Sequence, residues 1–355
     1  MHRHFARALV VVFLFAGTAF AQPPAPKHKI VATDRQTVTA TITYEMKTTK
    51  FAVTKWMVFL PEPPELPSQG KVKTTATPGG KLVTERSPLA RTVRYFELSV
   101  ANPVPGGGLS LKLEVEATLR ARTLVELQDG EAPPAVVALT ATEKKYYLSS
   151  TTCVDHDAKP FQAWLDAKEL RRGKTETPTD FAARVLEVIR ADYTYHYDPE
   201  EDKRASVACK ANATDCGGMT YLFVAAMRAS GVPARALVGR QAITRKPGTT
   251  AAQQDHERPH VRAELYVAGV GWVPVDPSYA RSGKSKPVAT FVGHDPGDLL
   301  VLHLDVDLQL RYPDRVRETQ LLQLGPHYWS KGNGTFDGYF GPTGWELKAT
   351  PFEKK

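Results

Sequence analysis

Apolar residues alternate with a period of two in the first part of the 355-residue chain, whereas the later part contains both helical and strand periods. This difference constrains the fold more than any other feature. Residues 30–128 contain short runs with period-two alternation between Gly- and Pro-rich turns, and no stretch with helical period. After the Pro-containing stretch at 128–136, helical and strand periods both occur. We therefore predict an all-β sandwich domain at 30–135 and an α+β domain at 136–320, with 321–355 as a C-terminal extension.

The second domain is expected to alternate between helices and strands. Helices are predicted at 158–172, at 216–230 and after Thr177, where Thr177 can cap, Pro178 suits the first helical position and Asp180 favours the first turn. Strands are predicted at 234–240, 260–267 and 272–276. Residues 299–310 also alternate, which places one set of side chains on one face: Leu302, Leu304, Val306, Leu308 and Leu310.

The first 21 residues have the pattern of a secretory signal peptide. A basic start precedes a short apolar run, and Ala19-Phe20-Ala21 provides a small-x-small cleavage site. Residues 22–29 then form a Pro-rich leader. We predict a secreted or periplasmic protein without a membrane span, because no later segment is long and apolar enough.

The formal net charge is +8, but the basic residues are scattered along the chain. There is no arginine-rich tract and no nucleic-acid-binding motif, so a nucleic-acid partner is not expected. The charge is consistent with solubility or with weak attraction to an anionic surface.

His256-Glu257-Arg258-Pro259-His260 fits the H-E-x-x-H pattern of zinc proteases, which requires a helix to bring both histidines to one metal. Pro259 is tolerated only in the first turn of a helix, and the residues after His260 alternate as in a strand. We therefore expect neither a metal site nor another cofactor here, and we interpret His260 as the first residue of a strand.

Cys216 opens the predicted helix at 216–230, with Asp215 as its N-cap. The unpaired N–H groups and the positive end of the helix dipole favour a thiolate at this position. Gly217 and Gly218 place no side chain beside the sulfur, so a substrate carbonyl could approach, and first-turn N–H groups could bind an oxyanion. The alternative is a buried structural cysteine.

His260 and Asp276 are predicted to meet across a β-hairpin. If the loop has three residues, from Ala268 to Val270, Val267 pairs with Gly271, Arg262 lies opposite Asp276, and His260 is diagonal to Asp276 on the same face. Asp276 could then orient the imidazole, as the third member of a Cys-His-Asp triad.

The three cysteines of the chain leave one thiol unpaired in an oxidising compartment. A Cys153–Cys209 disulfide is the pairing that leaves Cys216 free, whereas a Cys209–Cys216 disulfide would block it.

The segments DCGGMTYLFVAAMRASGVPARALVGR and PHVRAELYVAGVGWVPVDPSYA together resemble the core of the transglutaminase-like superfamily. The resemblance implies a papain-like α+β fold, with helices packed on an antiparallel sheet, and triad roles for Cys216, His260 and Asp276. The chain departs from the commoner His-Ala-Trp of the family at Val261 and Arg262. It shows no acidic loop of the kind that binds calcium in animal transglutaminases. Secondary candidates near substrate or oxyanion are Trp272, Tyr195 and Tyr197.

Two classes of function are compatible with these residues. The first is a secreted cysteine acyl-transfer enzyme that acts on peptide bonds or glutamine carboxamides of extracellular proteins or peptides, by hydrolysis or transamidation. The second is a non-catalytic binding or assembly module that retains the fold. The triad residues do not distinguish hydrolysis from transamidation.

Overall fold

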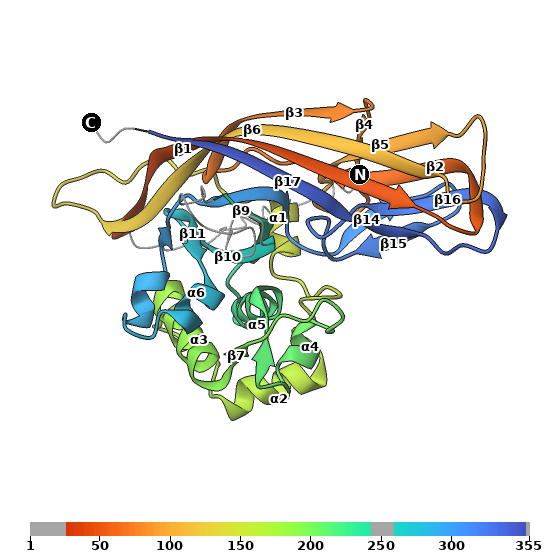
Figure 1. Cartoon of the computed structure of the whole chain (residues 1–355). Helices are drawn as coiled ribbons and strands as arrows, with labels where there is room; N and C mark the ends of the chain where they lie inside the picture. The colour runs from red at the N-terminus through yellow and green to blue at the C-terminus, as the bar shows by residue number, and fades with distance from the viewer. Residues whose placement is uncertain (1–25, 243–258, 353–355) are drawn as a thin grey trace, which may run out of the picture.

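The computed structural model describes residues 26–242 and 259–352. A long β domain lies across a second domain of helices and strands (Figure 1). Among the described residues, no helix is long and apolar enough to cross a membrane.

Two antiparallel sheets form the β domain. One has the order β12-β6-β1-β17, with β3 also paired to β6, and the other has the order β16-β2-β5-β4. The strands are β1 (His28–Lys47), β2 (Phe51–Pro61), β3 (Gln69–Thr77), β4 (Lys81–Thr84), β5 (Thr92–Ser99), β6 (Gly108–Glu126), β12 (His294–Asp295), β16 (His327–Gly334) and β17 (Tyr339–Pro351).

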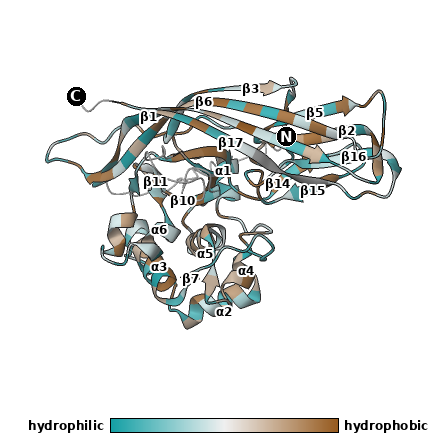
Figure 2. Ribbon diagram, viewed as in Figure 1, coloured by the Kyte–Doolittle hydropathy of each residue, from teal (hydrophilic) through white to brown (hydrophobic). Residues whose placement is uncertain are grey.

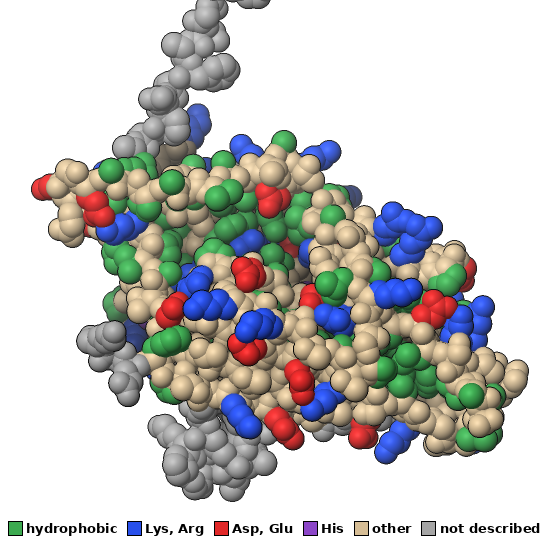
Figure 3. Space-filling view, turned by 90° about the horizontal axis from the view of Figure 1, so that it is seen from above, with side chains coloured by type: hydrophobic (Ala, Val, Ile, Leu, Met, Phe, Trp, Pro, Cys, Tyr) green, Lys and Arg blue, Asp and Glu red, His purple; other side chains and the backbone are tan. Residues whose placement is uncertain are grey.

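Alternating side chains of these strands make the core between the two sheets, as the colours along β1 and β6 in Figure 2 show. The buried members from β1, β2 and β6 are Val38, Ala40, Ile42, Tyr44, Met46, Trp56, Val58, Leu60, Leu111, Leu113, Val115, Ala117 and Leu119. The predicted β-sandwich is confirmed. Seen from above, Lys and Arg side chains are interspersed with Asp and Glu side chains on the outer face of this domain (Figure 3).

The C-terminal segment belongs to the sandwich. β17 pairs with β1 over nearly its whole length, and β16 pairs with β2. Our division at 321–355 therefore differs from the structure, because residues 327–351 complete both sheets. The physical reason is that long edge strands such as β1 and β2 need partners for their unpaired N–H and C=O groups.

The second domain has an antiparallel sheet of order β11-β10-β9-β13, with helices on one face. Its strands are β9 (Ala234–Gln241), β10 (Pro259–Val267), β11 (Gly271–Val275) and β13 (Leu299–Leu304). The helices are α1 (Ala141–Tyr146), α2 (Lys159–Ala167), α3 (Pro178–Asp192), α4 (Ala205–Ala208), α5 (Cys216–Ala229), α6 (Pro277–Ser282) and the 3₁₀ helix η3 (Val288–Phe291). Two short pairs complete it: β7 (Thr194–Tyr195) with β8 (Ala213–Thr214), and β14 (Leu308–Arg311) with β15 (Val316–Thr319).

The α5 helix is the centre of this domain and packs against β10. Every residue of α5 from Cys216 to Arg228 is buried. On the facing strand, Val261, Ala263 and Leu265 belong to the same hydrophobic core. The alternate residues Arg262 and Glu264 are also buried, and they bind side chains of the β domain and its connections. The sheet is therefore enclosed between the helices and the β domain.

Two helix predictions have clear outcomes. Thr177 caps α3 as predicted, accepting a hydrogen bond from Asp180 N at 3.1 Å. The helix predicted at 158–172 is shorter than expected, because α2 ends at Ala167 and Glu169 adopts a left-handed φ of 54°.

The alternating run at 299–310 is not one strand, and this prediction is wrong. Asp305 and Asp307 have φ values of 51° and 59°, which break the extended backbone between β13 and β14. β13 pairs with β9, whereas β14 pairs with β15, so the apolar residues on the two sides of the break enter different hydrophobic clusters.

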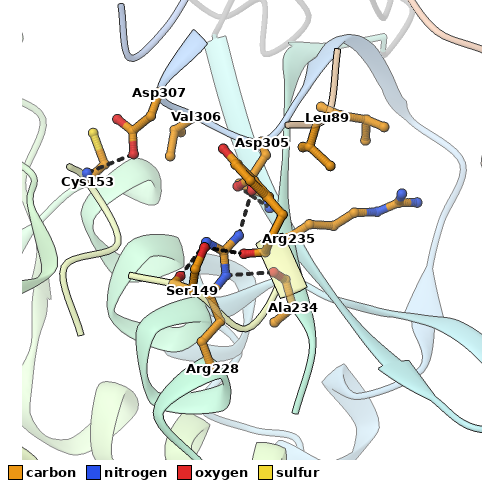
Figure 4. A network of polar contacts seen from close by, with 12 residues as sticks. Leu89, Ser149, Cys153, Arg228, Ala234, Arg235, Asp305, Val306 and Asp307 are labelled. Carbon is orange, nitrogen blue, oxygen red and sulfur yellow. Dashed lines mark hydrogen bonds and ion pairs between the residues drawn. The ribbon is translucent and has the colours of Figure 1, made fainter. Parts of the chain in front are cut away.

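A buried arginine holds this break against the end of α5. Figure 4 shows Arg228 pointing toward Ala234, Ser149 and Asp305. Its guanidinium donates to the carbonyl oxygens of Ala234 and Ser149, at 2.9 and 3.2 Å, and its Nη2 lies 2.5 Å from Asp305 Oδ2. From the other side, Arg91 of the β domain donates to three carbonyl oxygens of the break, those of Leu304, Val306 and Asp307.

Replacing Arg228 with Gln is expected to lower the free energy of unfolding by about 3–5 kcal/mol, because it leaves the Asp305 carboxylate buried without its ion-pair partner. Urea denaturation measures this change. Arg171→Gln is the control, since it breaks an exposed pair with Asp166 that is expected to contribute less than about 1 kcal/mol. Equal losses in the two variants would contradict the role assigned to Arg228.

Candidate active site

Cys216 is the first residue of α5, as predicted. The side chain of Asp215 caps the helix by accepting a hydrogen bond from Gly218 N at 3.1 Å. In the first turn of a helix the N–H groups lack helical acceptors. Since the N–H of Gly218 is taken by Asp215, those of Cys216 and Gly217 are the candidates for binding a negative charge beside the sulfur.

Packing also requires Gly218 and leaves little room at Gly217. A Cβ at Gly218 would lie 2.0 Å from Thr214 Oγ1, whereas one at Gly217 would lie 3.1 Å from Asp215 Oδ1 and 3.3 Å from Cδ of Lys203. Lys203 is nearly fully buried and places its Nζ 3.4 Å from Asp215 Oδ2. The sequence argument explained the glycines by substrate approach and missed both the packing and Lys203.

The hairpin β10–β11 has the predicted register. Val267 pairs with Gly271, and the pairing continues to Ala263 with Val275. The three-residue loop is closed by a hydrogen bond from Val270 N to Val267 O, and Gly269 adopts a φ of 77° that favours glycine. His260 lies near the start of β10, and Asp276 directly follows β11.

The side chains of His260 and Asp276 are in direct contact. His260 Nε2 lies 2.8 Å from Asp276 Oδ2, and both residues are only 5% exposed. The other carboxylate oxygen, Oδ1, accepts hydrogen bonds from Ser278 Oγ and Tyr279 N, each at 3.0 Å, so Asp276 also caps α6. The carboxylate is therefore fixed in one orientation toward the imidazole.

Cys216 lies beside His260, close enough for its side chain to raise the pKa of the imidazole through hydrogen bonding and charge. Because Nε2 is engaged by Asp276, Nδ1 is the ring nitrogen left for the sulfur. The three residues predicted to form a triad are thus brought together in the order sulfur, imidazole, carboxylate.

Charge around the imidazole favours its protonated form. Burial alone would lower the pKa of His260, but the charge and hydrogen bond of Asp276, together with Cys216, raise it to about 10. Burial would likewise raise the pKa of Asp276, but His260 and Arg262 hold it well below its usual range. The pair is thus an imidazolium beside a carboxylate near neutral pH.

Two residues that the sequence argument did not assign complete the surroundings of His260. The ring of Tyr279, in α6, lies 5.2 Å from the imidazole ring with an interplanar angle of 30°. Arg262 donates from Nε to Asp276 Oδ2 at 2.8 Å. The predicted register placed Arg262 opposite Asp276, but no sequence signal indicated Tyr279.

The secondary candidates Trp272, Tyr195 and Tyr197 lie in different parts of the second domain. Trp272 is four residues before Asp276, about 13 Å along the strand, and its ring contacts Arg235 and Tyr147. These contacts of Trp272 are with residues outside the triad, and its expected place near the substrate stays a prediction. Tyr195 is half exposed in β7, paired with Thr214 two residues before Cys216, and Tyr197 is also exposed.

All three cysteines are free thiols in the structure, so the predicted Cys153–Cys209 disulfide is not formed in it. Each of these cysteines has another partner: the backbone N–H of Cys153 donates to Asp307 Oδ2 at 2.9 Å, and Cys209 Sγ donates to the Ser206 carbonyl oxygen at 3.4 Å. Burial, followed by the charge of Asp307, raises the pKa of Cys153, and burial raises that of Cys209 to about 11.

The zinc-protease pattern does not lie on a helix at its second histidine, because β10 begins at Pro259. His256 lies outside the described residues. Within 26–242 and 259–352, no cluster of three His, Cys, Asp or Glu side chains is placed to hold a metal ion.

Comparison with known proteins agrees with this geometry. Residues 167–277 match the family model described as "Transglutaminase-like superfamily", and this range contains Cys216, His260 and Asp276. The chain carries a transglutaminase-like domain. No curated protein matches the sequence.

Solved structures similar to this chain include the "Putative Cysteine Protease from Cytophaga hutchinsonii", with a TM-score of 0.56 at 11% identity, covering 92% of this chain and 94% of that one. The periplasmic domain of TgpA from Pseudomonas aeruginosa also matches, with a TM-score of 0.35 at 15% identity, covering 69% and 92%. The first likeness extends over both domains and shows a shared fold. The α+β fold with a transglutaminase-like core and a preceding β-sandwich is therefore confirmed.

Proposed function

We propose that this chain is a secreted or periplasmic cysteine acyl-transfer enzyme that acts on amide bonds of peptides or of glutamine side chains. The observation that carries the proposal is the position of His260 between Cys216 and Asp276 at the start of α5. A cysteine at a helix N-terminus beside an imidazolium has the surroundings that favour a nucleophilic thiolate.

In the proposed reaction the Cys216 thiolate attacks the amide carbonyl carbon, and a C–S bond forms. The resulting oxyanion is stabilised by the N–H groups of Cys216 and Gly217. The C–N bond then breaks, and His260 gives its proton to the departing amine, which leaves a thioester on the sulfur.

The second half of the cycle regenerates the enzyme. His260 takes a proton from water or from an incoming amine, whose oxygen or nitrogen attacks the thioester carbon. The C–S bond breaks, and Cys216 leaves as a thiolate while His260 is again protonated. Water yields hydrolysis and an amine yields transamidation.

The proposal is tested by capture of the thioester on the full chain. The protein is mixed with peptides that contain glutamine and internal amide bonds, quenched in acid, and digested for mass spectrometry. We expect an acyl adduct on the peptide containing Cys216, and none in Cys216→Ala. Cys153 and Cys209 are internal controls, because burial raises the pKa of both thiols and so disfavours their reactive thiolate forms.

The outcome also separates the enzyme from the non-catalytic module. If Cys216 forms no adduct and reacts with iodoacetamide only after denaturation, the module is favoured. A glutamine-side-chain adduct indicates transamidase or amidase chemistry, and an adduct from peptide-bond cleavage indicates a peptidase.

A further inference from the structure

Arg262 connects the catalytic pair to the rest of the molecule. Its side chain is 3% exposed, and its guanidinium makes three ion pairs. Nε lies 2.8 Å from Asp276 Oδ2, Nη1 lies 3.1 Å from Asp295 Oδ1, and Nη2 lies 2.5 Å from Asp298 Oδ1.

His260 and Arg262 share one oxygen atom. Asp276 Oδ2 lies 2.8 Å from His260 Nε2 and 2.8 Å from Arg262 Nε. The Tyr279 ring contacts both donors, lying 5.2 Å from the imidazole ring and 5.4 Å from the guanidinium carbon. Since Arg262 takes part of the negative potential of this oxygen, it reduces the potential that acts on the imidazole.

The β domain fixes Arg262 through Asp295. Arg122 of β6 is fully buried, and its Nη2 lies 3.1 Å from Asp295 Oδ2, the oxygen that Arg262 does not bind. Arg122 also pairs with Glu264 at 2.6 Å, and Glu264 pairs with Arg235 at 2.7 Å. A chain of buried charges thus runs from the β domain to His260.

Among the described residues, three arginines of this cluster face four carboxylates, which leaves one negative charge for the imidazolium of His260 to offset before Cys216 is counted. The members are Arg122, Arg235, Arg262, Glu264, Asp276, Asp295 and Asp298. Unbalanced charge is costly in a buried site, so the cluster favours the imidazolium.

We propose that Arg262 is a positioning residue of the pair formed by His260 and Asp276. Arg262 shares Asp276 Oδ2 with His260 and thereby sets how strongly the protonated imidazole is stabilised. Arg122 of the β domain holds Arg262 in place through Asp295. This inference rests on the proposed function, because it assigns Arg262 a role at that same site.

The contacts around His260 predict whether a substitution stabilises or destabilises the imidazolium. Within the described part of the chain, the groups that face His260 are Cys216 of α5, Asp276, and Tyr279 of α6, and Arg262 and Asp298 are linked to it through Asp276. Arg262→Gln removes a positive charge, so the imidazolium is held more strongly. Asp298→Asn removes the negative charge that offsets Arg262, so the imidazolium is held more weakly.

The test is the pH profile of Cys216 alkylation by iodoacetamide in the full chain, from pH 5 to 10.5. The alkaline inflection of this profile is the pH at which His260 loses its proton. We expect this pH to be higher by roughly 0.5–1 unit in Arg262→Gln and lower by a similar amount in Asp298→Asn. Arg262→Lys retains the charge and is expected to return the inflection to within about 0.3 unit of the wild type.

Arg235→Gln is the matched control, because it removes a buried arginine from the same cluster but from the branch that pairs with Glu264. It is expected to lower the melting temperature while moving the inflection by less than a third of the Arg262→Gln shift. If Arg262→Gln does not fold, the direction of the Asp298→Asn shift decides, since Asn keeps an acceptor for Arg262.

Shifts of opposite sign support the inference. Shifts in the same direction, or none in either variant, overturn it while the proposed function stands, provided that wild-type Cys216 reacts and His260→Ala suppresses the reaction. A wild-type Cys216 that does not react in the folded chain overturns both.

Discussion

Replacing His260 with Ala is expected to lower the rate constant for Cys216 alkylation at pH 6 by about 100-fold or more. An ordinary thiol, which ionises near pH 8.5, is less than about 1% thiolate at pH 6. In the wild type the imidazolium stays protonated well above this pH, because Asp276 and Cys216 raise the pKa of His260 to about 10 despite burial. Without the imidazole, the sulfur loses the cation that stabilises a thiolate.

The measurement is a second-order rate constant for iodoacetamide, with the modified cysteine identified by mass spectrometry. His327→Ala is the control, since His327 is a part-buried histidine of β16 that hydrogen-bonds to the Tyr312 hydroxyl at 2.7 Å, away from the site. Above pH 9.5 the difference between His260→Ala and the wild type should narrow to a few-fold. A His260→Ala rate equal to that of the control at pH 6 would show that His260 does not assist the sulfur.

The parts of the site that the sequence predicted are those set by local chemistry. Asp215 before Cys216 is a strong N-cap, and Gly231 with Pro233 stops the helix, so the position of Cys216 at the start of α5 follows from a short segment. The hairpin register follows from a glycine-containing loop and period-two alternation, which fixed Val267 opposite Gly271. These local rules were sufficient to predict that His260 and Asp276 meet on one face of the hairpin.

The parts that the sequence did not predict depend on contacts between distant segments. β17 pairs with β1 across some 300 residues of chain, and its Gly- and aromatic-rich sequence has no local strand signal. β3 was missed because its residues are mainly Lys and Thr, which suit an edge strand exposed to water and give no apolar alternation. Asp305 and Asp307 interrupt an otherwise regular alternation at a break that arginines from distant segments bind.

The same limit applies to the surroundings of the triad. The register placed Arg262 opposite Asp276, but its partners Asp295 and Asp298 lie more than 30 residues further along the chain. Trp272 was assigned to the site on the basis of its segment, whereas its position on the strand places it beside Arg235. Local sequence patterns therefore predicted the positions of Cys216, His260 and Asp276 better than they predicted the distant contacts that hold these residues.

Replacing Asp276 with Asn is expected to remove the low-pH reactivity of Cys216 while retaining the local fold. Asn is as good an N-cap as Asp, so α6 keeps its cap, and Arg262 keeps its pairs with Asp295 and Asp298. The variant loses the charge that opposes the effect of burial on His260, so the pKa of His260 falls and the imidazole is neutral near pH 7. Alkylation at pH 6 should then fall by about 100-fold and recover with the ionisation of an ordinary thiol near pH 8.5.

The pH dependence of the free energy of unfolding gives an independent test of the pair formed by His260 and Asp276. Because the folded-state pKa of His260 is raised from 6.5 to about 10, its contribution to stability is complete below pH 6.5 and is lost as the pH rises through 10. Between pH 7 and 10, the free energy of unfolding should therefore fall more steeply in the wild type than in Asp276→Asn.

Ser278→Ala is the matched control, since it removes one hydrogen bond to Asp276 Oδ1 and leaves Oδ2, with its bond to His260, in place. Its alkylation profile should stay within about threefold of the wild type, because the carboxylate charge that holds the imidazolium is retained. Parallel stability curves for the wild type and Asp276→Asn, with unchanged alkylation at pH 6, would mean that the carboxylate orients the hairpin but does not hold the imidazole in its charged form.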